Sequence, residues 1–423
     1  MLDAISVLVT LAALFIWLND RFFGFSSTVA MMASGVFSAF AVLALERIGL
    51  EGITEQVTSS LVALQFEATL MNVVIGVLLY VAALKINLRL FEQQHVLILI
   101  LAVVSTLLNT VLTGFATWGL LTALGLPVPL LHSLLFGALI SPTDPIATVS
   151  ILRSVGLPER LEVVIEGESL LNDGVGAVAF TILLGIVLTG EQPALLDIGI
   201  EILRDVGGGV VLGILLGCVG GAMSRLDASL TAHVLISLAI ILLGGLLARQ
   251  LSVSYPLAMV AAGVAHAWLL FDEDTSSDED HLMFWKTVED VLVAGLFLTL
   301  GLMAISTATH AMAWLTVVLI LPVVLVCRFL SVWFGLGLDG RGQKSLRLPS
   351  LLTWGGLRGG ISVALALSLP DIESRNLLLQ LSYGVVLFSV LLQAPTIARL
   401  FKPDALNRMV KVLDGEAVSQ SFD

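Results

Sequence analysis

Long apolar segments recur from one end of this chain to the other, and they constrain its fold more than any single motif does. Each runs for roughly 17 to 30 residues, which is long enough to cross a hydrocarbon layer about 30 Å thick as an α-helix. In the whole sequence 57% of the residues are hydrophobic and only 13% are charged. Soluble domains carry about 25% charged residues. We therefore predict an all-α, polytopic membrane protein.

The apolar pattern divides the chain into about thirteen predicted spans. Asp3 precedes the first one, no basic residue stands ahead of its apolar core, and no small-residue cleavage site follows it, so we predict a span and not a signal peptide. We expect residues 401–423 to form a short cytoplasmic tail. The predicted spans lie near residues 4–18, 26–45, 67–84, 95–124, 130–152, 158–189, 193–223, 230–248, 254–271, 283–304, 310–336, 349–369 and 376–398.

The connections between the spans predict the orientation of the chain. Basic residues gather in the cytoplasmic connections of membrane proteins, and here most of them fall on one side of the predicted membrane. This places the N-terminus outside and the C-terminus in the cytoplasm. The acidic run DEDTSSDED, residues 272–280, also falls on the cytoplasmic side, but carboxylates count for little in this rule, so we interpret it as a solvated connection. The basic side contains Arg21, Lys85, Arg89, Arg153, Arg160, Arg225, Arg341, Lys344, Arg347, Arg399, Lys402, Arg408 and Lys411, and the other side contains Arg47, Arg249 and Arg375.

Few ionisable residues lie well inside the predicted spans. An ionised side chain at the centre of a bilayer costs at least about 2.5 to 3.5 kcal/mol, so each one needs a partner, water or a function. The question is which of them are paired and which are left for an ion. They are Asp144, Glu166, Glu168, Asp173, Arg328 and Arg358.

The sequence SPTDP predicts a break in one span. Pro145 removes a backbone donor and disfavours helical geometry at Asp144, and Pro142 acts in the same way nearby, so the helix should open around Thr143. At membrane depth an open turn survives only inside protein or beside a wet cavity, and its free carbonyls next to a carboxylate form a site for a hard cation. The alternative is a simple proline kink in which Asp144 bonds to nearby amides.

The sequence EGESLLNDG gives the next span two polar faces. Glu168 and Asn172 are four residues apart and share one face, while Ser169, Asp173 and Glu166 share the neighbouring face. A carboxylate that faces a partly desolvated cavity without a fixed cation can hold a proton and release it when a metal ion arrives. Such competition is an exchange mechanism.

Arg328 lies within the apolar segment LPVVLVCRFLSVW. It needs a permanent anion, because a guanidinium does not lose its proton in proteins. Glu168 is our candidate partner. The alternative is that Arg328 reaches towards the lipid headgroups.

Arg358 lies in the segment TWGGLRGGISVALAL, where four glycines loosen the predicted helix. Two interrupted helices, one in each half of a chain, are typical of inverted-repeat transporters with their site near the midplane. Arg358 would then face the partial negative ends of the broken helices, or pair with a carboxylate.

Two further patterns are interpreted as packing. Glycines four residues apart form a smooth ridge that allows close helix packing. The histidines are scattered, mostly near span ends and without the spacing of metal ligands, which favours interfacial or packing roles. The glycines are Gly209, Gly213, Gly217 and Gly221, and the histidines are His95, His132, His233, His266, His281 and His310.

Together these motifs resemble those of the sodium/proton antiporters of the monovalent cation:proton antiporter superfamily, in the NhaP-type and mammalian exchanger branch. The order and placement of SPTDP, EGESLLNDG, Arg328 and GGLRGG carry the resemblance, which extends over nearly the whole chain. It implies an NhaA-like antiporter fold with inverted repeats and two discontinuous, crossing helices, assembled as a homodimer. The implied boundaries are 1–400 for the transmembrane antiporter domain, roughly 1–94 and 193–304 for its dimerisation part, and roughly 95–189 and 310–398 for its ion-transporting core.

The resemblance also implies a role for each motif residue. Asp173 would bind cation and proton in turn, and Asp144, Ser169 and the carbonyl of Thr143 would complete the site for the transported ion. Asn172 stands where a second aspartate marks the electrogenic branch, which implies electroneutral exchange of one cation for one proton. The residues that would shape the site are Asn172, Glu168 and Arg328 as a buried ion pair, Arg358 of the second unwound helix, and Glu166.

The leading hypothesis is a secondary antiporter, and not an enzyme, that exchanges Na⁺, Li⁺ or K⁺ for H⁺. We expect it in a cell membrane, namely a bacterial inner membrane, where it would serve sodium and pH homeostasis. The sequence predicts no resident cofactor. The expected partners are monovalent cations, protons, membrane lipids and a second copy of the chain, and the net charge of −13 argues against nucleic acid.

Two other classes of function compete with this hypothesis. A cation channel or an ion-gated membrane sensor would use the same polar core without coupled exchange, but the sequence has no clear ring-forming filter or sensory domain. An intramembrane protease needs a nucleophile with a base or metal ligands. Ser169 has no histidine at usable spacing on its own helix, and the motif HExxH is missing.

Overall fold

The computed structural model describes residues 2–47, 74–190, 195–226, 229–270, 277–302, 311–340 and 346–413. Within these ranges the chain is helical and contains no strand, and an isolated β-bridge joins Asp144 to Leu357. The larger part of the acidic connection 272–280 and the beginning of the predicted span 67–84 lie outside the described residues.

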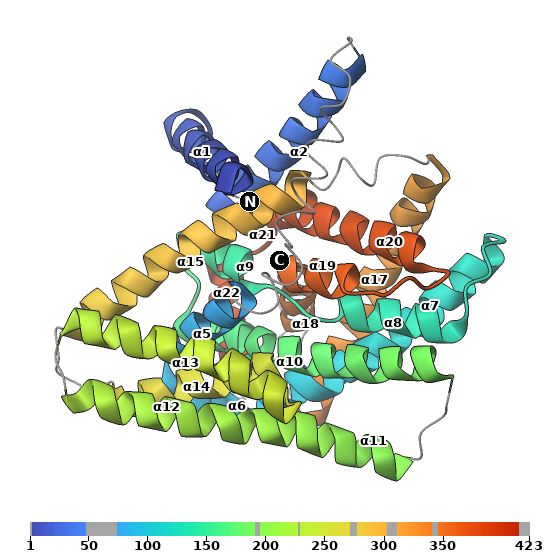
Figure 1. Cartoon of the computed structure of the whole chain (residues 1–423). Helices are drawn as coiled ribbons and strands as arrows, with labels where there is room; N and C mark the ends of the chain where they lie inside the picture. The colour runs from blue at the N-terminus through green and yellow to red at the C-terminus, as the bar shows by residue number, and fades with distance from the viewer. Residues whose placement is uncertain are drawn as a thin grey trace.

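The helices are numbered as in Figure 1, and η marks a stretch of π-helix. In the first part of the chain they are α1 (Leu2–Leu18), η1 (Asn19–Phe23), α2 (Ser27–Arg47), α5 (Ile75–Lys85), α6 (Leu88–Leu99), η3 (Ile100–Ser105), α7 (Thr106–Ala123), α8 (Leu130–Ile140), α9 (Pro145–Ser154) and α10 (Glu159–Thr189). They continue with α11 (Leu195–Ile202), η4 (Leu203–Gly207), α12 (Gly208–Leu226), α13 (Leu230–Leu251), α14 (Tyr255–Leu270), α15 (Ser277–Leu302), α17 (Ala311–Leu338), α18 (Arg347–Trp354), α19 (Gly360–Leu367), α20 (Arg375–Phe388), η5 (Ser389–Gln393), α21 (Ala394–Leu400) and α22 (Pro403–Leu413).

Helices overlap every predicted span, because in hydrocarbon a long apolar segment satisfies its backbone groups only within itself. Among the described residues, eight helical segments are long and apolar enough to cross a membrane, and three shorter apolar helices accompany them. The chain is therefore a multi-pass helical membrane protein. The total number of crossings stays a prediction.

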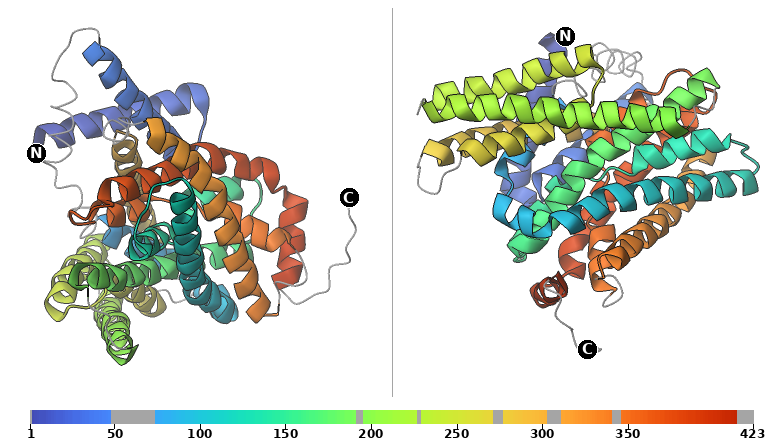
Figure 2. Two further views of the ribbon diagram at one scale, coloured as in Figure 1. Left: turned by 90° about the vertical axis from the view of Figure 1, so that its right-hand side faces the viewer. Right: turned by 90° about the horizontal axis from the view of Figure 1, so that it is seen from below.

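α10 lies in the middle of the molecule and organises the helices around it. It packs against α6, α7, α8, α9 and α14 (Figures 1 and 2). On one side of the molecule α12 runs beside α13 and α14, and elsewhere α17 packs against α7, α18 and α20. α10 also contacts α19, so its residues can reach both of the interrupted spans.

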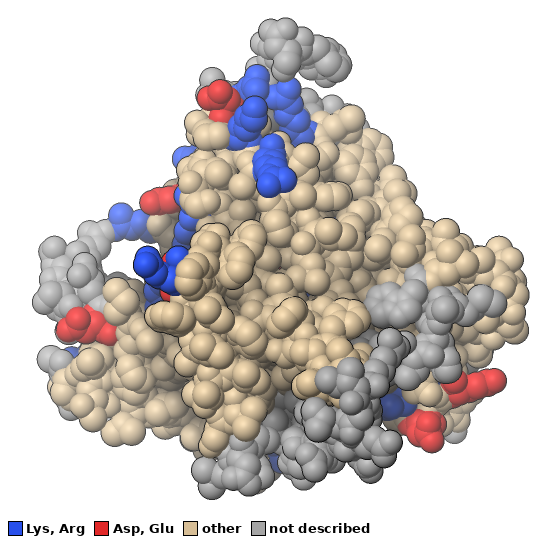
Figure 3. All heavy atoms as spheres, turned by 90° about the horizontal axis from the view of Figure 1, so that it is seen from above, with Lys and Arg blue, Asp and Glu red and all other residues tan. Residues whose placement is uncertain are grey.

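The surface agrees with a chain that lies in lipid. One face consists mostly of side chains that are neither acidic nor basic, and Lys and Arg gather towards its edges (Figure 3). Large apolar side chains are well exposed, among them Phe37 at 70% and Leu203 at 73%. Exposed apolar surface of this extent marks an interaction with lipid or protein.

The glycine ridge lies on α12 and packs against α14. A Cβ atom at Gly213 would overlap the carbonyl oxygen of Ala258, and one at Gly217 would overlap that of Ala262. The two backbones approach this closely because neither position carries a side chain. The packing role predicted for these glycines is confirmed.

Three of the histidines lie together in the folded protein, although they are scattered along the sequence. His233, His266 and His281 come from α13, α14 and α15 and lie together in the interior, each at most 2% exposed. The hydroxyl of Tyr80 on α5 lies 2.5 Å from Nδ1 of His266, and Nε1 of Trp285 donates to His281 over 3.0 Å. Their burial agrees with a packing role, but their proximity is invisible in the linear sequence.

The region predicted to be a short tail contains a packed helix. α22 buries Leu406, Met409 and Leu413, which recur at helical spacing, and it contacts α10 and α18. The first part of this tail is therefore folded against the helical body.

We predict that Gly217→Leu lowers the free energy of unfolding by about 1 to 3 kcal/mol, because the larger side chain forces α12 away from α14. The measurement is thermal or denaturant unfolding of the purified protein in detergent. The matched control is Gly119→Leu on α7, where no atom lies near the added Cβ and stability should stay close to that of the wild type. Equal stability of the two variants would contradict the close packing of α12 on α14.

Candidate functional site

The predicted break in SPTDP lies between α8 and α9. α8 ends at Ile140, and α9 begins at Pro145. Asp144 has extended backbone angles (φ −104°, ψ 116°), which the following proline favours. Its carboxylate caps α9 by accepting a hydrogen bond of 2.9 Å from the Ile146 amide. The helix thus opens around Thr143, as predicted. The bond from a nearby amide to Asp144, which the alternative prediction of a proline kink included, is present as well.

The glycine-rich segment forms a second break, and the two breaks touch. α18 ends at Trp354, and α19 begins at Gly360. The Asp144 amide donates a hydrogen bond of 2.8 Å to the carbonyl of Leu357. A Cβ atom at Gly359 would overlap the Asp144 carboxylate, so glycine permits the approach. The sequence predicted two interrupted helices, and their interruptions meet.

Arg358 holds the end of α8. Its Nη1 donates to the carbonyl oxygens of Ser141 and Pro142, over 2.8 Å and 3.0 Å, and the residue is only 2% exposed. These carbonyls continue the C-terminal end of α8, which carries a partial negative charge. Of the two predicted roles for Arg358, its contacts match the one that faces a broken helix end.

The two polar faces of α10 converge on Thr143. The Thr143 amide donates to Asn172 Oδ1 over 3.2 Å, and Asn172 Nδ2 donates to the Thr143 hydroxyl over 2.7 Å. The Ser169 hydroxyl donates to the Thr143 carbonyl and lies 3.1 Å from the Thr143 hydroxyl. The side-chain amide of Asn172 and the hydroxyl of Ser169, both on the regular helix α10, therefore hold the irregular backbone between α8 and α9 in place.

Glu168 and Arg328 form a buried ion pair. Nη2 of Arg328 lies 2.7 Å from Oε1 of Glu168, and the two side chains are 1% and 4% exposed. The same carboxylate oxygen accepts a hydrogen bond of 2.9 Å from Asn172. The predicted pairing is confirmed, and the alternative in which Arg328 reaches the lipid headgroups is wrong.

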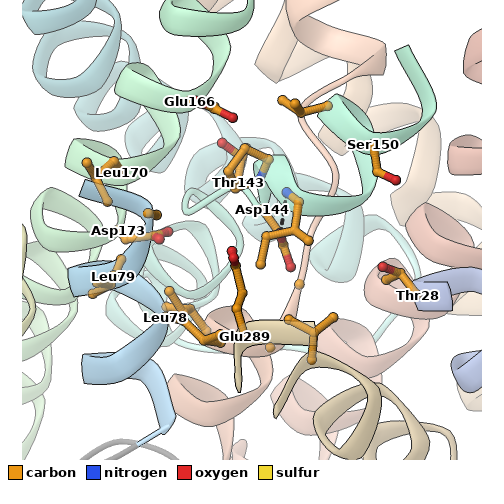
Figure 4. A pocket seen from close by; sticks show the side chains of 18 of the residues that line it. Thr28, Leu78, Leu79, Thr143, Asp144, Ser150, Glu166, Leu170, Asp173 and Glu289 are labelled. Atoms are coloured by element: carbon orange, nitrogen blue, oxygen red, sulfur yellow. Dashed lines mark hydrogen bonds between the residues drawn. The ribbon is translucent and has the colours of Figure 1, made fainter. Parts of the chain in front are cut away.

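Asp173 faces a cavity of about 420 Å³. The cavity also reaches Thr143 and Asp144, and the side chains of all three meet around one open space (Figure 4). Asp173 is 5% exposed, and its Oδ1 accepts no hydrogen bond from the described residues. A buried carboxylate oxygen without a donor is costly unless a proton or a cation joins it.

The structure places Asp173 and Ser169, two of the predicted ion-binding residues, in different spaces. Asp173 lines the cavity, Ser169 lines a much smaller space beside it, and Thr143 and Asp144 line both. Glu166 also lines the cavity, nearer to its charged rim, where its Oε1 lies 3.5 Å from Nη2 of Arg153. Ser169 therefore lies behind the cavity wall.

Two acidic residues of the cavity, Glu289 and Asp290, were missed in the sequence. Glu289 on α15 lines the cavity, is 6% exposed and forms an ion pair with Lys85 of α5. The signal was present, because Glu289 lies inside the predicted span 283–304 and adds a carboxylate to the few charges at membrane depth.

The donor set suits a hard, weakly charged ion. Carboxylates, hydroxyls and a backbone carbonyl are oxygen ligands, which alkali and alkaline-earth cations prefer. Over the described part of the chain, no three His, Cys, Asp or Glu residues come together as a transition-metal site would require. The arrangement can bind a proton or a small cation at Asp173, with Asp144 beside it.

The chain is similar to known ion exchangers over nearly all of its length. A family model described as "Sodium/hydrogen exchanger, transmembrane" matches residues 8–402. The Na(+)/H(+) antiporter NhaP of Pseudomonas aeruginosa is 35% identical over 415 residues, which cover 95% of this chain and 96% of the relative. The Na(+)/H(+) antiporter NhaH of Halobacillus dabanensis is 33% identical over 345 residues, which cover 80% of this chain and 83% of the relative.

The fold is also that of a solved antiporter. The sodium proton antiporter MjNhaP1 of Methanocaldococcus jannaschii superposes with a TM-score of 0.74 at 19% identity, covering 95% of this chain and 97% of that one. The fold and the cavity define a membrane protein with a buried acidic site. The chain belongs to the sodium/hydrogen exchanger family.

We predict that Glu168→Met and Arg328→Met each lower the free energy of unfolding by about 3 to 5 kcal/mol, because each leaves the opposite charge buried and unpaired. The double variant should lose much less than the sum of the two, since it leaves no unpaired charge at this position. Unfolding in detergent of the wild type and the three variants gives this double-mutant cycle. Additive losses would contradict a direct pair.

Proposed function

We propose that the chain exchanges one Na⁺ for one H⁺ across the membrane by alternating access, with both ions competing for Asp173. The observation that carries this proposal is the buried Asp173 oxygen at the cavity, which has no hydrogen-bond donor among the described residues. Membership of the sodium/hydrogen exchanger family and relatives named Na(+)/H(+) antiporters support Na⁺ and H⁺ as the exchanged ions. Li⁺ and K⁺ are the alternative cations.

The cation would be bound by Asp173 together with Asp144, the Thr143 carbonyl and the Ser169 hydroxyl. In the described state the Ser169 hydroxyl is bonded to that same carbonyl. A hydroxyl that donates its proton to a carbonyl keeps its own lone pairs, and the carbonyl oxygen keeps a second one. The Ser169 hydroxyl and the Thr143 carbonyl could therefore each offer a lone pair to the cation while the bond between them remains.

Asn172 supports a one-for-one exchange. Its side chain is fully engaged as a neutral brace for Thr143 and Glu168, so α10 presents a single carboxylate, Asp173, to the inner end of the cavity. One carboxylate that takes either Na⁺ or H⁺ carries the same charge in both loaded states. The exchange would then be electroneutral.

The surrounding residues would keep this site in place while the protein moves. Glu168 with Arg328, and Arg358 with the end of α8, would join the helices of an ion-transporting core formed by residues 95–189 and 310–398. Residues 1–94 and 193–304 would form the dimerisation part. Glu166 would stabilise the cavity rim with Arg153.

The wider assembly is part of the same proposal. We expect about thirteen spans with inverted repeats, the N-terminus outside, the C-terminus in the cytoplasm, and a homodimer in contact with lipid in a bacterial inner membrane. The family membership and the long apolar helices support the multi-pass part of this proposal, and the apolar surface supports contact with lipid.

Asp173→Asn should abolish Na⁺-dependent proton movement in proteoliposomes and leave the protein folded, because asparagine can take neither a proton nor the place of an anionic ligand. Glu92→Gln, which removes an exposed carboxylate on α6, is the control and should transport like the wild type. Full exchange by Asp173→Asn would refute the assignment.

Exchange by the wild type should be independent of the membrane potential, since one positive charge crosses in each direction. The measurement is the rate of Na⁺-dependent proton movement with the potential clamped at several values. A rate that follows the potential would contradict one-for-one exchange.

A further inference from the structure

Glu289 lies on the opposite wall of the cavity from the motif residues. It comes from α15, and its carboxylate points towards the open space that Asp173, Asp144 and Thr143 also face (Figure 4). Only 6% of the residue is exposed. A cation inside the cavity can therefore contact this carboxylate as well as that of Asp173.

The partner of Glu289 is a lysine, whose long side chain is flexible and partly exposed. Lys85, the last residue of α5, forms the ion pair, and its side chain is 32% exposed against 8% for Glu289. A lysine ammonium is a compact monovalent charge on a flexible four-carbon stem, in contrast to the planar and rigid guanidinium of arginine. The ammonium of Lys85 therefore resembles a monovalent cation on a flexible chain. The partner of Glu168, in contrast, is Arg328, which is fully buried.

The cavity as a whole attracts cations. The described residues that line it include more carboxylates than basic groups, so its walls carry net negative charge when all are ionised. Lys85 offsets part of that charge at Glu289. If Lys85 moved away, the buried carboxylate would need another cation. The acidic residues are Asp144, Glu166, Asp173, Glu289 and Asp290, and the basic residues are Lys85, Arg153 and Lys286.

We infer that Glu289 is a relay site for the transported cation and that Lys85 is its tethered competitor. An incoming Na⁺ replaces the Lys85 ammonium at Glu289 and then passes to Asp173, after which Lys85 returns. No covalent bond changes, and the charge at Glu289 is neutralised before and after the step. The inference rests on the proposed antiport, and it makes Glu289 a determinant of the apparent affinity for the cation.

Glu289→Gln tests the relay. It removes the carboxylate and leaves the Lys85 ammonium facing the cavity, so the apparent KM for Na⁺ should rise by about tenfold through charge repulsion, while the maximal rate changes less. Glu289→Asp, which keeps the charge, should restore most of the affinity. The measurement is Na⁺-dependent proton movement in proteoliposomes over a range of Na⁺ concentrations, with Glu92→Gln as the control.

A second comparison separates the relay from a merely structural ion pair. The double variant Lys85→Gln/Glu289→Gln removes both charges and leaves neither unpaired. If the pair only joins α5 to α15, this variant should have the wild-type KM. The relay predicts a KM that stays above the wild-type value but below that of Glu289→Gln.

The outcomes are distinct for the relay and for the antiport. An active wild type whose KM is unchanged in Glu289→Gln overturns the relay and leaves the antiport intact. A wild type without exchange, or full exchange by Asp173→Asn, overturns the antiport and the relay with it.

Discussion

The structure depends on how the backbone polar groups are satisfied where two helices open inside an apolar protein. An unpaired amide or carbonyl at membrane depth costs on the order of several kcal/mol, so a break in one helix is stable only when something completes it. Here each break supplies a hydrogen-bond partner to the other, because the Asp144 amide donates to the Leu357 carbonyl. Arg358 covers the carbonyls of Ser141 and Pro142 at the end of α8. The bond that makes the open backbone tolerable also fixes the carboxylate of Asp144 at the cavity.

The position of each carboxylate on α10 then determines whether the protein supplies its partner. Glu168 and Asp173 are five residues apart on the same helix and have opposite surroundings. Glu168 pairs with Arg328 and accepts a hydrogen bond from Asn172. Its charge is therefore already neutralised by the protein and is not available to a transported ion. Asp173 faces the cavity, where Oδ1 accepts no bond from the described residues. The division between a structural carboxylate and an exchanging one follows from the face of α10 on which each residue lies.

Local chemistry made much of this predictable from the sequence. Proline at Pro142 and Pro145 restricts the backbone whatever surrounds it, so the break around Thr143 could be located without a structure. The high cost of a charge in hydrocarbon marked six residues, including Asp173, and the permanent charge of Arg328 demanded a buried anion. These inferences depend on single residues and on their distance from the ends of an apolar segment. The particular role of Asp173 came from the family resemblance.

The remaining features depend on which helix faces meet, and sequence spacing does not give that. Ser169 was expected at the ion but lies behind Thr143 in the described state, because its hydroxyl bonds to the backbone carbonyl. Glu289 and Lys85 are far apart in the sequence and meet only through the packing of α5 on α15. The cluster around His266 is likewise assembled from several helices, so no motif announces it.

The central claim is that Na⁺ and H⁺ compete for Asp173, and proton release on Na⁺ binding tests it most directly. Calorimetric titration of Na⁺ into the purified protein, repeated in buffers with different ionisation enthalpies, counts the protons released for each Na⁺ bound. At a pH where the free protein holds its proton, the account predicts one proton released per Na⁺ in the wild type and none in Asp173→Asn. Na⁺ binding without proton release in the wild type, or unchanged release in the variant, would contradict it.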